Sequence, residues 1–124
     1  MAPHHDLSLE DITLINTCLS SEHRLRILNA IKSFSPICQA DIHKVLDFES
    51  QRFTSSHLAF LTDRGIIGPK KYGKYTFYKI CSKYNEVIKY HVKKLKEDPV
   101  FIQDKRRYKH LKSKKELVLD GPIK

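Results

Sequence analysis

The sequence is poor in the motifs on which enzymes depend. It has only four glycines in 124 residues, and it contains no glycine-rich phosphate loop, no GxSxG nucleophile motif and no HExxH zinc motif. Its acidic residues and histidines are scattered, and such side chains form a catalytic set only where they converge. We therefore expect a protein that is not an enzyme and that needs no cofactor.

Cysteine is also scarce. Cys18, Cys38 and Cys81 are widely spaced and odd in number, with no CxxC or CxC pair. This spacing argues against zinc knuckles and disulfide frameworks, so no metal site is predicted. Cys18 and Cys81 are expected to be small buried residues, because free cysteine is commonly buried. For Cys38 a redox role stays open, since a partly exposed lone thiol can be reactive.

Signals for export or membrane insertion are missing as well. The first residues, MAPHHDLSLED, lack the basic and apolar regions of a secretory signal. No apolar run is long enough to cross a bilayer. We expect a cytoplasmic protein with no membrane partner.

Positive charge, in contrast, is abundant. The net charge is +9 and the isoelectric point is about 9.5. Residues 105–124 alone hold eight basic and two acidic side chains, a net +6, which leaves +3 for residues 1–104. Such a surplus favours polyanionic partners, with nucleic acid first among them.

The apolar periodicity predicts one domain over residues 8–98, after a short arm at 1–7. Ser8 and Asp11 resemble a capping pair that opens the first helix. Pro99 is expected to end the last helix, and a basic extension with weak periodicity follows over residues 99–124. Helices are predicted at 8–19, 22–34, 39–46, 50–64 and 82–98, with a two-stranded hairpin at 66–80.

This order, α-α-α-α-β-β-α, describes a mainly α fold with a small β-hairpin, the winged helix-turn-helix. In that architecture one helix lies in the major groove and presents polar side chains to the base edges from its N-terminal half. The helix at 50–64 suits this role, because Thr54, Leu58 and Leu61 form its inner side and its N-terminal half lacks acids. Its expected DNA contacts are Ser50, Gln51, Arg52, Ser55, Ser56 and His57.

The hairpin, at about residues 67–80, is the expected wing. Its lysines surround Gly73, where they serve little structural purpose. We expect them to contact DNA phosphates or the minor groove. The wing contacts are Lys70, Lys71, Tyr72 and Lys74.

Three segments together resemble the ArsR-type (arsenic repressor) family of winged-helix regulators. They are HRLRILNAIKS at 23–33, ADIHKVLDFESQRFTSSHLAFLTDRGII at 40–67 and GKYTFYKI at 73–80. The resemblance spans roughly residues 12–97, and the order and spacing of the segments carry it. It implies a DNA-binding repressor that acts by occluding a promoter.

The sequence departs from that family's pattern at the metal sites. Members that sense thiophilic metals carry a CxC pair before the helix-turn-helix, whereas here Ala40 stands where the second thiolate after Cys38 is needed. Members that bind metal on the last helix use several ligands, and here that helix offers only Glu86 and His91. Because a metal site needs several converging ligands, the resemblance implies no intact metal site. Any effector is unknown.

Two further departures lie in the helix-turn-helix. Glu49 is an extra residue in the turn. Phe53 replaces a small polar residue, and its ring can either extend the core or contact a thymine methyl group.

The last predicted helix, 82–98, has one apolar stripe with lysines opposite. We expect this helix, together with the first one, to form the interface of a homodimer. The interface residues are Tyr84, Val87, Ile88, His91, Val92 and Leu95.

The run KRRYKHLKSKK, residues 105–115, contains seven basic residues and no acid. It is either a solvated tail or a segment that follows the DNA backbone. Tyr108 and Leu111 can also lie on a helix that packs against the dimer.

Two other functions stay open. The chain can be a non-specific, architectural DNA binder that uses its basic tail. It can also be a winged-helix module that docks on an acidic protein surface, with Phe53 as the anchor. The acid-free start of the helix at 50–64 favours sequence-specific binding to double-stranded DNA.

Overall fold

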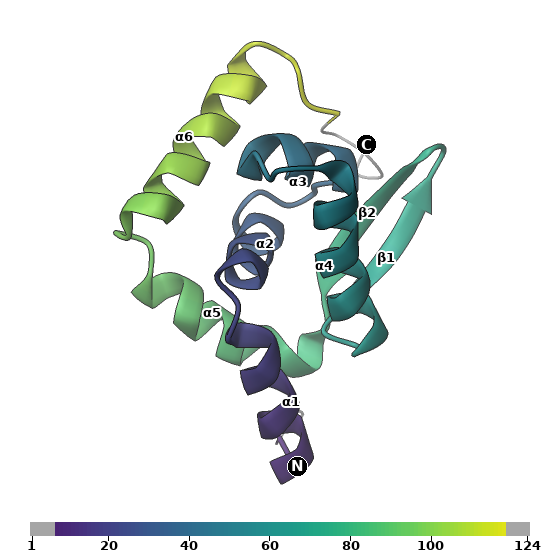
Figure 1. Cartoon of the computed structure of the whole chain (residues 1–124), viewed down its shortest axis with the longest axis vertical. Helices are drawn as coiled ribbons and strands as arrows, with labels where there is room; N and C mark the ends of the chain where they lie inside the picture. The colour runs from purple at the N-terminus through teal and green to yellow at the C-terminus, as the bar shows by residue number, and fades with distance from the viewer. Residues whose placement is uncertain (1–6, 119–124) are drawn as a thin grey trace.

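The computed structural model describes residues 7–118, so the predicted arm at 1–7 lies outside the described residues except for Leu7. The described part is mainly helical with one antiparallel hairpin (Figure 1), which confirms the predicted fold class. Its elements are α1 Leu9–Leu19, α2 Glu22–Ser33, α3 Gln39–Leu46, α4 Gln51–Asp63, β1 Ile67–Tyr72, β2 Tyr75–Ile80, the 3₁₀ helix η1 Ser82–Tyr84, α5 Asn85–Lys94 and α6 Pro99–Ser113.

The helix boundaries follow from capping side chains. Ser8 and Asp11 form the predicted capping box of α1, with each side chain accepting the other's backbone N–H at 3.0 Å. Ser21 caps α2 and Ser50 caps α4 in the same way, through one hydroxyl each. Gly65 follows α4 with φ +75°, a conformation that glycine adopts at little cost.

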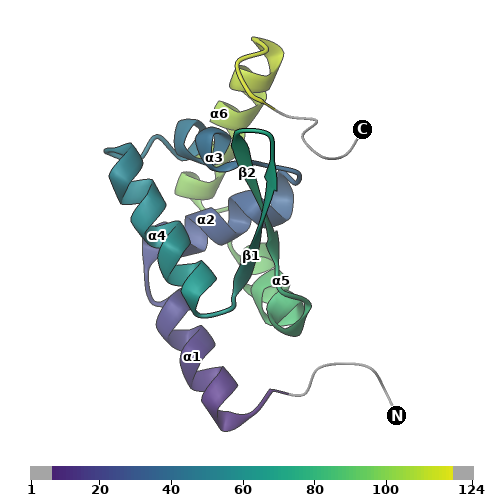
Figure 2. The same cartoon turned by 90° about the vertical axis from the view of Figure 1, so that its right-hand side faces the viewer.

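Helix α2 occupies the centre of the molecule. It packs against α1, α3, α4, α5 and β2. Figures 1 and 2 show these elements arranged around it from two directions. Its consecutive residues Ile27, Leu28, Asn29, Ala30 and Ile31 are all buried, as expected of a helix enclosed on several sides.

Helix α6 packs on the domain, so residues 105–113 are not a solvated tail. Pro99 is its first residue, which is compatible with a helix because the N–H that proline lacks has no partner at that position. Phe101 is buried against the rest of the chain, and the Tyr108 ring stacks on Phe34 with centroids 4.2 Å apart. The helix predicted at 82–98 is shorter in the structure, where a 3₁₀ turn precedes α5, α5 ends at Lys94 and Pro99 begins the next helix.

A buried ion pair joins α6 to α2 and α3. The Asp104 carboxylate is 1% exposed and lies 2.7 Å from the guanidinium of Arg26 and 3.4 Å from that of Arg107. Arg26 also donates to the carbonyl oxygen of Leu46 at 2.8 Å, and Arg107 donates to that of Val45 at 2.7 Å. These two carbonyls belong to the last turn of α3, where cations are favoured.

Part of the predicted dimer interface is wrong. Tyr84 is 4% exposed and Ile88 is 1% exposed, because both side chains pack in the chain's own core. The apolar stripe of α5 packs against α2. Only the side chains at the edges of this stripe have surface that a second copy of the chain could bury. Val87, His91, Val92 and Leu95 are half-buried.

Candidate nucleic-acid interface

Helices α3 and α4 form a helix-turn-helix with a short turn between them. Asp47 ends α3 in a left-handed conformation, with φ 54°. His43 Nδ1 lies 2.8 Å from Thr54 Oγ1, a hydrogen bond that ties α3 to the inner side of α4. That predicted inner side is confirmed, since Thr54, Leu58 and Leu61 are each no more than 1% exposed.

The outer face of α4 is polar and free of acidic residues in its first turn. Gln51, Arg52, Ser55 and Ser56 are all exposed. Within residues 7–118, none of these four side chains is bonded to another side chain. They are thus available for an external partner, and amide, guanidinium and hydroxyl groups are the ones that read base edges or bind phosphates.

The other two residues predicted to contact DNA, Ser50 and His57, make contacts within the chain. Ser50 Oγ accepts the backbone N–H of Phe53 at 3.0 Å and so caps the helix. His57 is half-buried, and its ring stacks on that of His23. Burial is the main cause that lowers the pKa of His57, and the positive charges of Arg24 and His23 lower it further.

Phe53 is part of an aromatic cluster formed by His23, Phe48, Phe53 and His57. Its ring meets those of His23 and His57 nearly edge-on, with centroids 4.8 and 4.6 Å away, and that of Phe48 at 5.4 Å. Edge-to-face pairs of this kind stabilise beyond the burial of area alone. Of the two roles that the sequence left open, Phe53 therefore has the first and extends the core.

The hairpin β1–β2 presents its lysines to solvent as predicted. Tyr72 pairs with Tyr75 around a two-residue turn, and Gly73 has the positive φ, 62°, that such turns require. Lys70, Lys71, Tyr72 and Lys74 are all exposed. The Lys70 ammonium lies 5.7 Å from the centre of the Tyr72 ring, so the two side chains form one cationic and aromatic surface at the tip.

The wing is fixed to the first helix of the helix-turn-helix. The Tyr78 hydroxyl donates to Gln39 Oε1 at 3.1 Å, and Cys38 forms a backbone bridge with Phe77. Burial raises the pKa of Tyr78, so its hydroxyl keeps the proton that it donates. This pair could not be predicted from the sequence, because the bond joins residues far apart in the chain.

The outcome differs among the three cysteines. Cys18 is buried as predicted, whereas the prediction for Cys81 is wrong, because it follows the end of β2 and is exposed. Cys38 is buried, and this burial raises the pKa of its thiol, the opposite of what a reactive thiolate needs. Among residues 7–118, no three His, Cys, Asp or Glu side chains converge to hold a metal ion.

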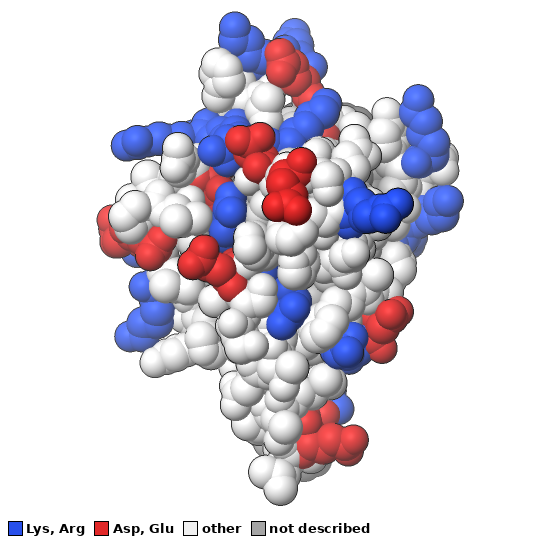
Figure 3. Space-filling view, in the orientation of Figure 1, with Lys and Arg blue, Asp and Glu red and all other residues white. Residues whose placement is uncertain are grey.

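Figure 3 shows Lys and Arg side chains over the upper end of the molecule and along the wing at its right, with Asp and Glu side chains among them at the upper end. No helix among the described residues has the length and apolar character required to cross a membrane.

Taken with the exposed face of α4 and the lysine-bearing hairpin, the fold is that of a winged helix-turn-helix protein. The structure is similar to that of HlyU from Vibrio cholerae N16961, with 24% identity, a TM-score of 0.58 and coverage of 68% of this chain and 87% of that chain. The structure of reduced HlyU from the same organism matches with the same identity and TM-score and with 84% of its chain covered. No protein-family model matches the chain. The likeness to HlyU establishes the fold.

Proposed function

We propose that this protein is a transcriptional regulator that binds specific sequences of double-stranded DNA as a homodimer. In this proposal α4 lies in the major groove, and the wing contacts the backbone or the minor groove. The fold that the chain shares with HlyU supports the proposal, because this fold places one helix and a hairpin where a duplex can meet both. Occlusion of a promoter, and thus repression, is the proposed mode of action.

The polar outer face of α4 is the observation that carries the proposal. Gln51 and Arg52 stand in the first turn of the helix, followed one turn later by Ser55 and Ser56. Arg can pair with guanine and Gln with adenine through two hydrogen bonds, and Ser suits either base. The start of α4 and the tip of the wing lie at the same end of the molecule in both views (Figures 1 and 2). One duplex can therefore meet both elements.

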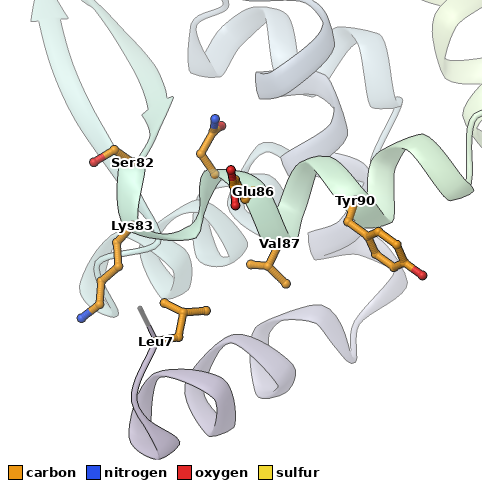
Figure 4. A pocket seen from close by; sticks show the side chains of 7 residues that line it. Leu7, Ser82, Lys83, Glu86, Val87 and Tyr90 are labelled. Carbon is orange, nitrogen blue, oxygen red and sulfur yellow. The ribbon is translucent and has the colours of Figure 1, made fainter. Parts of the chain in front are cut away.

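The surface of α1 and α5 supports the dimer. Leu9 and Ile12 on α1 and Tyr90 on α5 are 85%, 40% and 59% exposed, and exposed apolar surface is typical of sites that bind a partner. Figure 4 shows Leu7 and Val87 facing one another across a hollow between these two helices. In the proposal a second copy of the chain covers this surface, so that two α4 helices face successive major grooves, about one turn of DNA apart.

The position of Phe53 gives little support to the alternative function, a module that docks on another protein. In that function Phe53 is the natural anchor, and its half-buried ring is engaged by Phe48 and two histidines. The exposed residues around it on α4 are polar, and none is a large apolar side chain that could replace Phe53 as the anchor.

The experiment that tests the proposal is selection from a randomised duplex pool, followed by sequencing and by affinity measurements against salt. Enrichment of an inverted repeat with a steep salt dependence is the expected result. Binding without an enriched motif would replace the proposal with an architectural role. Absence of binding at low salt would overturn it.

A further inference from the structure

The C-terminal segment after α6 folds back onto α3. Lys115 reverses the chain with φ 58°, and the backbone N–H of Glu116 donates to the carbonyl oxygen of Leu111 at 3.0 Å. The N–H of Val118 then reaches the Asp41 carboxylate, with both oxygens 2.9 Å away. Lys44 donates to the carbonyl oxygen of Glu116 at 2.8 Å. Residues 114–118 thus form a strap that is bonded to the first helix of the helix-turn-helix.

This strap determines where the last lysines lie. The inward side of α6 carries Phe101, Asp104 and Tyr108, which face the core or its ion pair. In the last two turns of α6, Lys112 lies one turn after Tyr108, with its ammonium 5.7 Å from the centre of that ring. Together with the strap, these turns present a set of exposed lysines, which we call the basic end of α6. It consists of Lys109, Lys112, Lys114 and Lys115.

The basic end of α6 shares one end of the molecule with the DNA-binding elements. In Figures 1 and 2 the last turn of α6, the tip of the wing and the start of α4 all lie at the top of the view. Figure 3 shows Lys and Arg side chains over this same end, together with a few Asp and Glu side chains. Helix α3 connects the parts, because Gln39 bonds to the wing and Asp41 bonds to the strap.

We propose that the basic end of α6 is a second phosphate-binding surface, which contacts the DNA backbone beside the segment read by α4. The inference rests on the proposed function. Because the strap is already ordered by Asp41 and Lys44, binding does not have to order a loose tail, and a preorganised surface loses less affinity to ordering. Lysine is suited to phosphates rather than to base identity, so these contacts add affinity for longer duplexes without changing the sequence preference.

The test uses the full chain with the four lysines of the basic end changed to alanine. Its matched control changes four exposed lysines in and after α5, at another part of the surface and with the same loss of charge: Lys89, Lys93, Lys94 and Lys96. Both are compared with the wild type on the selected duplex at its minimal length and with about ten extra base pairs on each side, roughly one turn of DNA. Light scattering verifies that both variants keep the wild-type oligomeric state.

The wild type is expected to bind the longer duplex more tightly than the minimal one. In the basic-end variant, the ratio of the affinities for the longer and the minimal duplex is expected to fall at least tenfold. The slope of its affinity against salt should fall by about 0.9 for each phosphate contact removed. Equal affinity and slope for this variant and the wild type, or an equal loss in the matched control, would overturn the inference. If the wild type binds both lengths equally, the inference fails while the proposed function stands. If it binds neither duplex, both fail.

Discussion

The rings of His23 and His57 stack in parallel, with centroids 5.5 Å apart and 20° between their planes. This contact joins the first turn of α2 to the middle of α4. Each ring also meets the edge of Phe53, so two imidazoles share one aromatic environment. Protonation of His57 is disfavoured here by its burial and by the positive charge of Arg24.

The stack predicts that stability falls on the acidic side of neutrality. The pKa of His57 is lowered from its ordinary value of 6.5 in the folded chain, so the unfolded chain binds more protons just below that pH. The free energy of unfolding should therefore rise with pH from the lowered pKa up to about 6.5 and be unaffected by this residue above it. Urea unfolding between pH 5 and 8 measures this dependence.

The variant His57→Phe keeps an aromatic ring in the cluster and removes its titration. It should show a flatter dependence on pH than the wild type. His110→Gln, which removes an exposed imidazole on α6, is the matched control. An unchanged pH profile in His57→Phe would show that the stack does not couple to protonation.

The sequence predicted α1 to α4 and the wing closely, because each of these elements carries a local signal. Serine caps, an apolar period of 3.6 and a glycine at a turn are readable without knowledge of the fold. Helix α6 lacked such a signal, because Asp104 interrupts its apolar stripe. Arg26 on α2, 78 residues earlier in the chain, bonds to both oxygens of that carboxylate and, with Arg107, makes it acceptable in the interior.

For the candidate site, the sequence correctly identified the outer face of α4 and the wing lysines as exposed. Sequence-based prediction is less accurate for side chains at the edge of a helix face, because helical periodicity does not show which neighbouring element packs on them. His57 lies next to the polar face but is covered by His23. Ile88 belongs to an amphipathic stripe, and periodicity cannot distinguish burial in the own chain from burial in a partner.

Removal of the Asp104 carboxylate is expected to destabilise the fold strongly. The variant Asp104→Ala leaves the Arg26 guanidinium, 15% exposed, without its partner. Loss of one member of a buried pair typically costs about 3–5 kcal/mol. Urea unfolding should show a loss in this range, whereas Glu97→Ala, at an exposed carboxylate, should change stability by less than about 0.5 kcal/mol. Equal stability of the two variants would contradict a structural role for the pair.

The cap of α4 is expected to contribute measurably to stability. Ser50→Ala removes the hydroxyl that accepts the N–H of Phe53, and the loss of such a cap costs about 1 kcal/mol. Ser50→Asp retains an acceptor and should recover most of this loss. Ser55→Ala, on the exposed face of the same helix, is the control for helix propensity and should be close to neutral in urea unfolding. A neutral Ser50→Ala would exclude the capping role.

Arg52 and Lys71 are expected to differ in what they contribute to DNA binding. Arg52→Ala should relax the base preference at one position, with about 1–3 kcal/mol of discrimination lost. Lys71→Ala should weaken all duplexes alike and lower the salt slope by about 1, as expected for a phosphate contact. Competition binding with single-base variants of the selected site distinguishes the two. Equal loss of specificity from both substitutions would contradict this division of roles.

The exposed apolar side chains of α1 and α5 are expected to hold the dimer together. The double variant Leu9→Glu/Tyr90→Glu places charges where the proposed partner buries apolar surface, and unpaired charges are costly at an interface core. Sedimentation equilibrium should give a mass near twice 14.5 kDa for the wild type and near 14.5 kDa for the variant. Val100→Glu, at an apolar side chain on α6 that is 38% exposed, is the matched control and should stay dimeric. If the double variant stays dimeric, the dimer interface must lie on another part of the surface. A monomeric one should also bind the inverted repeat no better than a single half-site, because dimerisation is what couples the two half-sites.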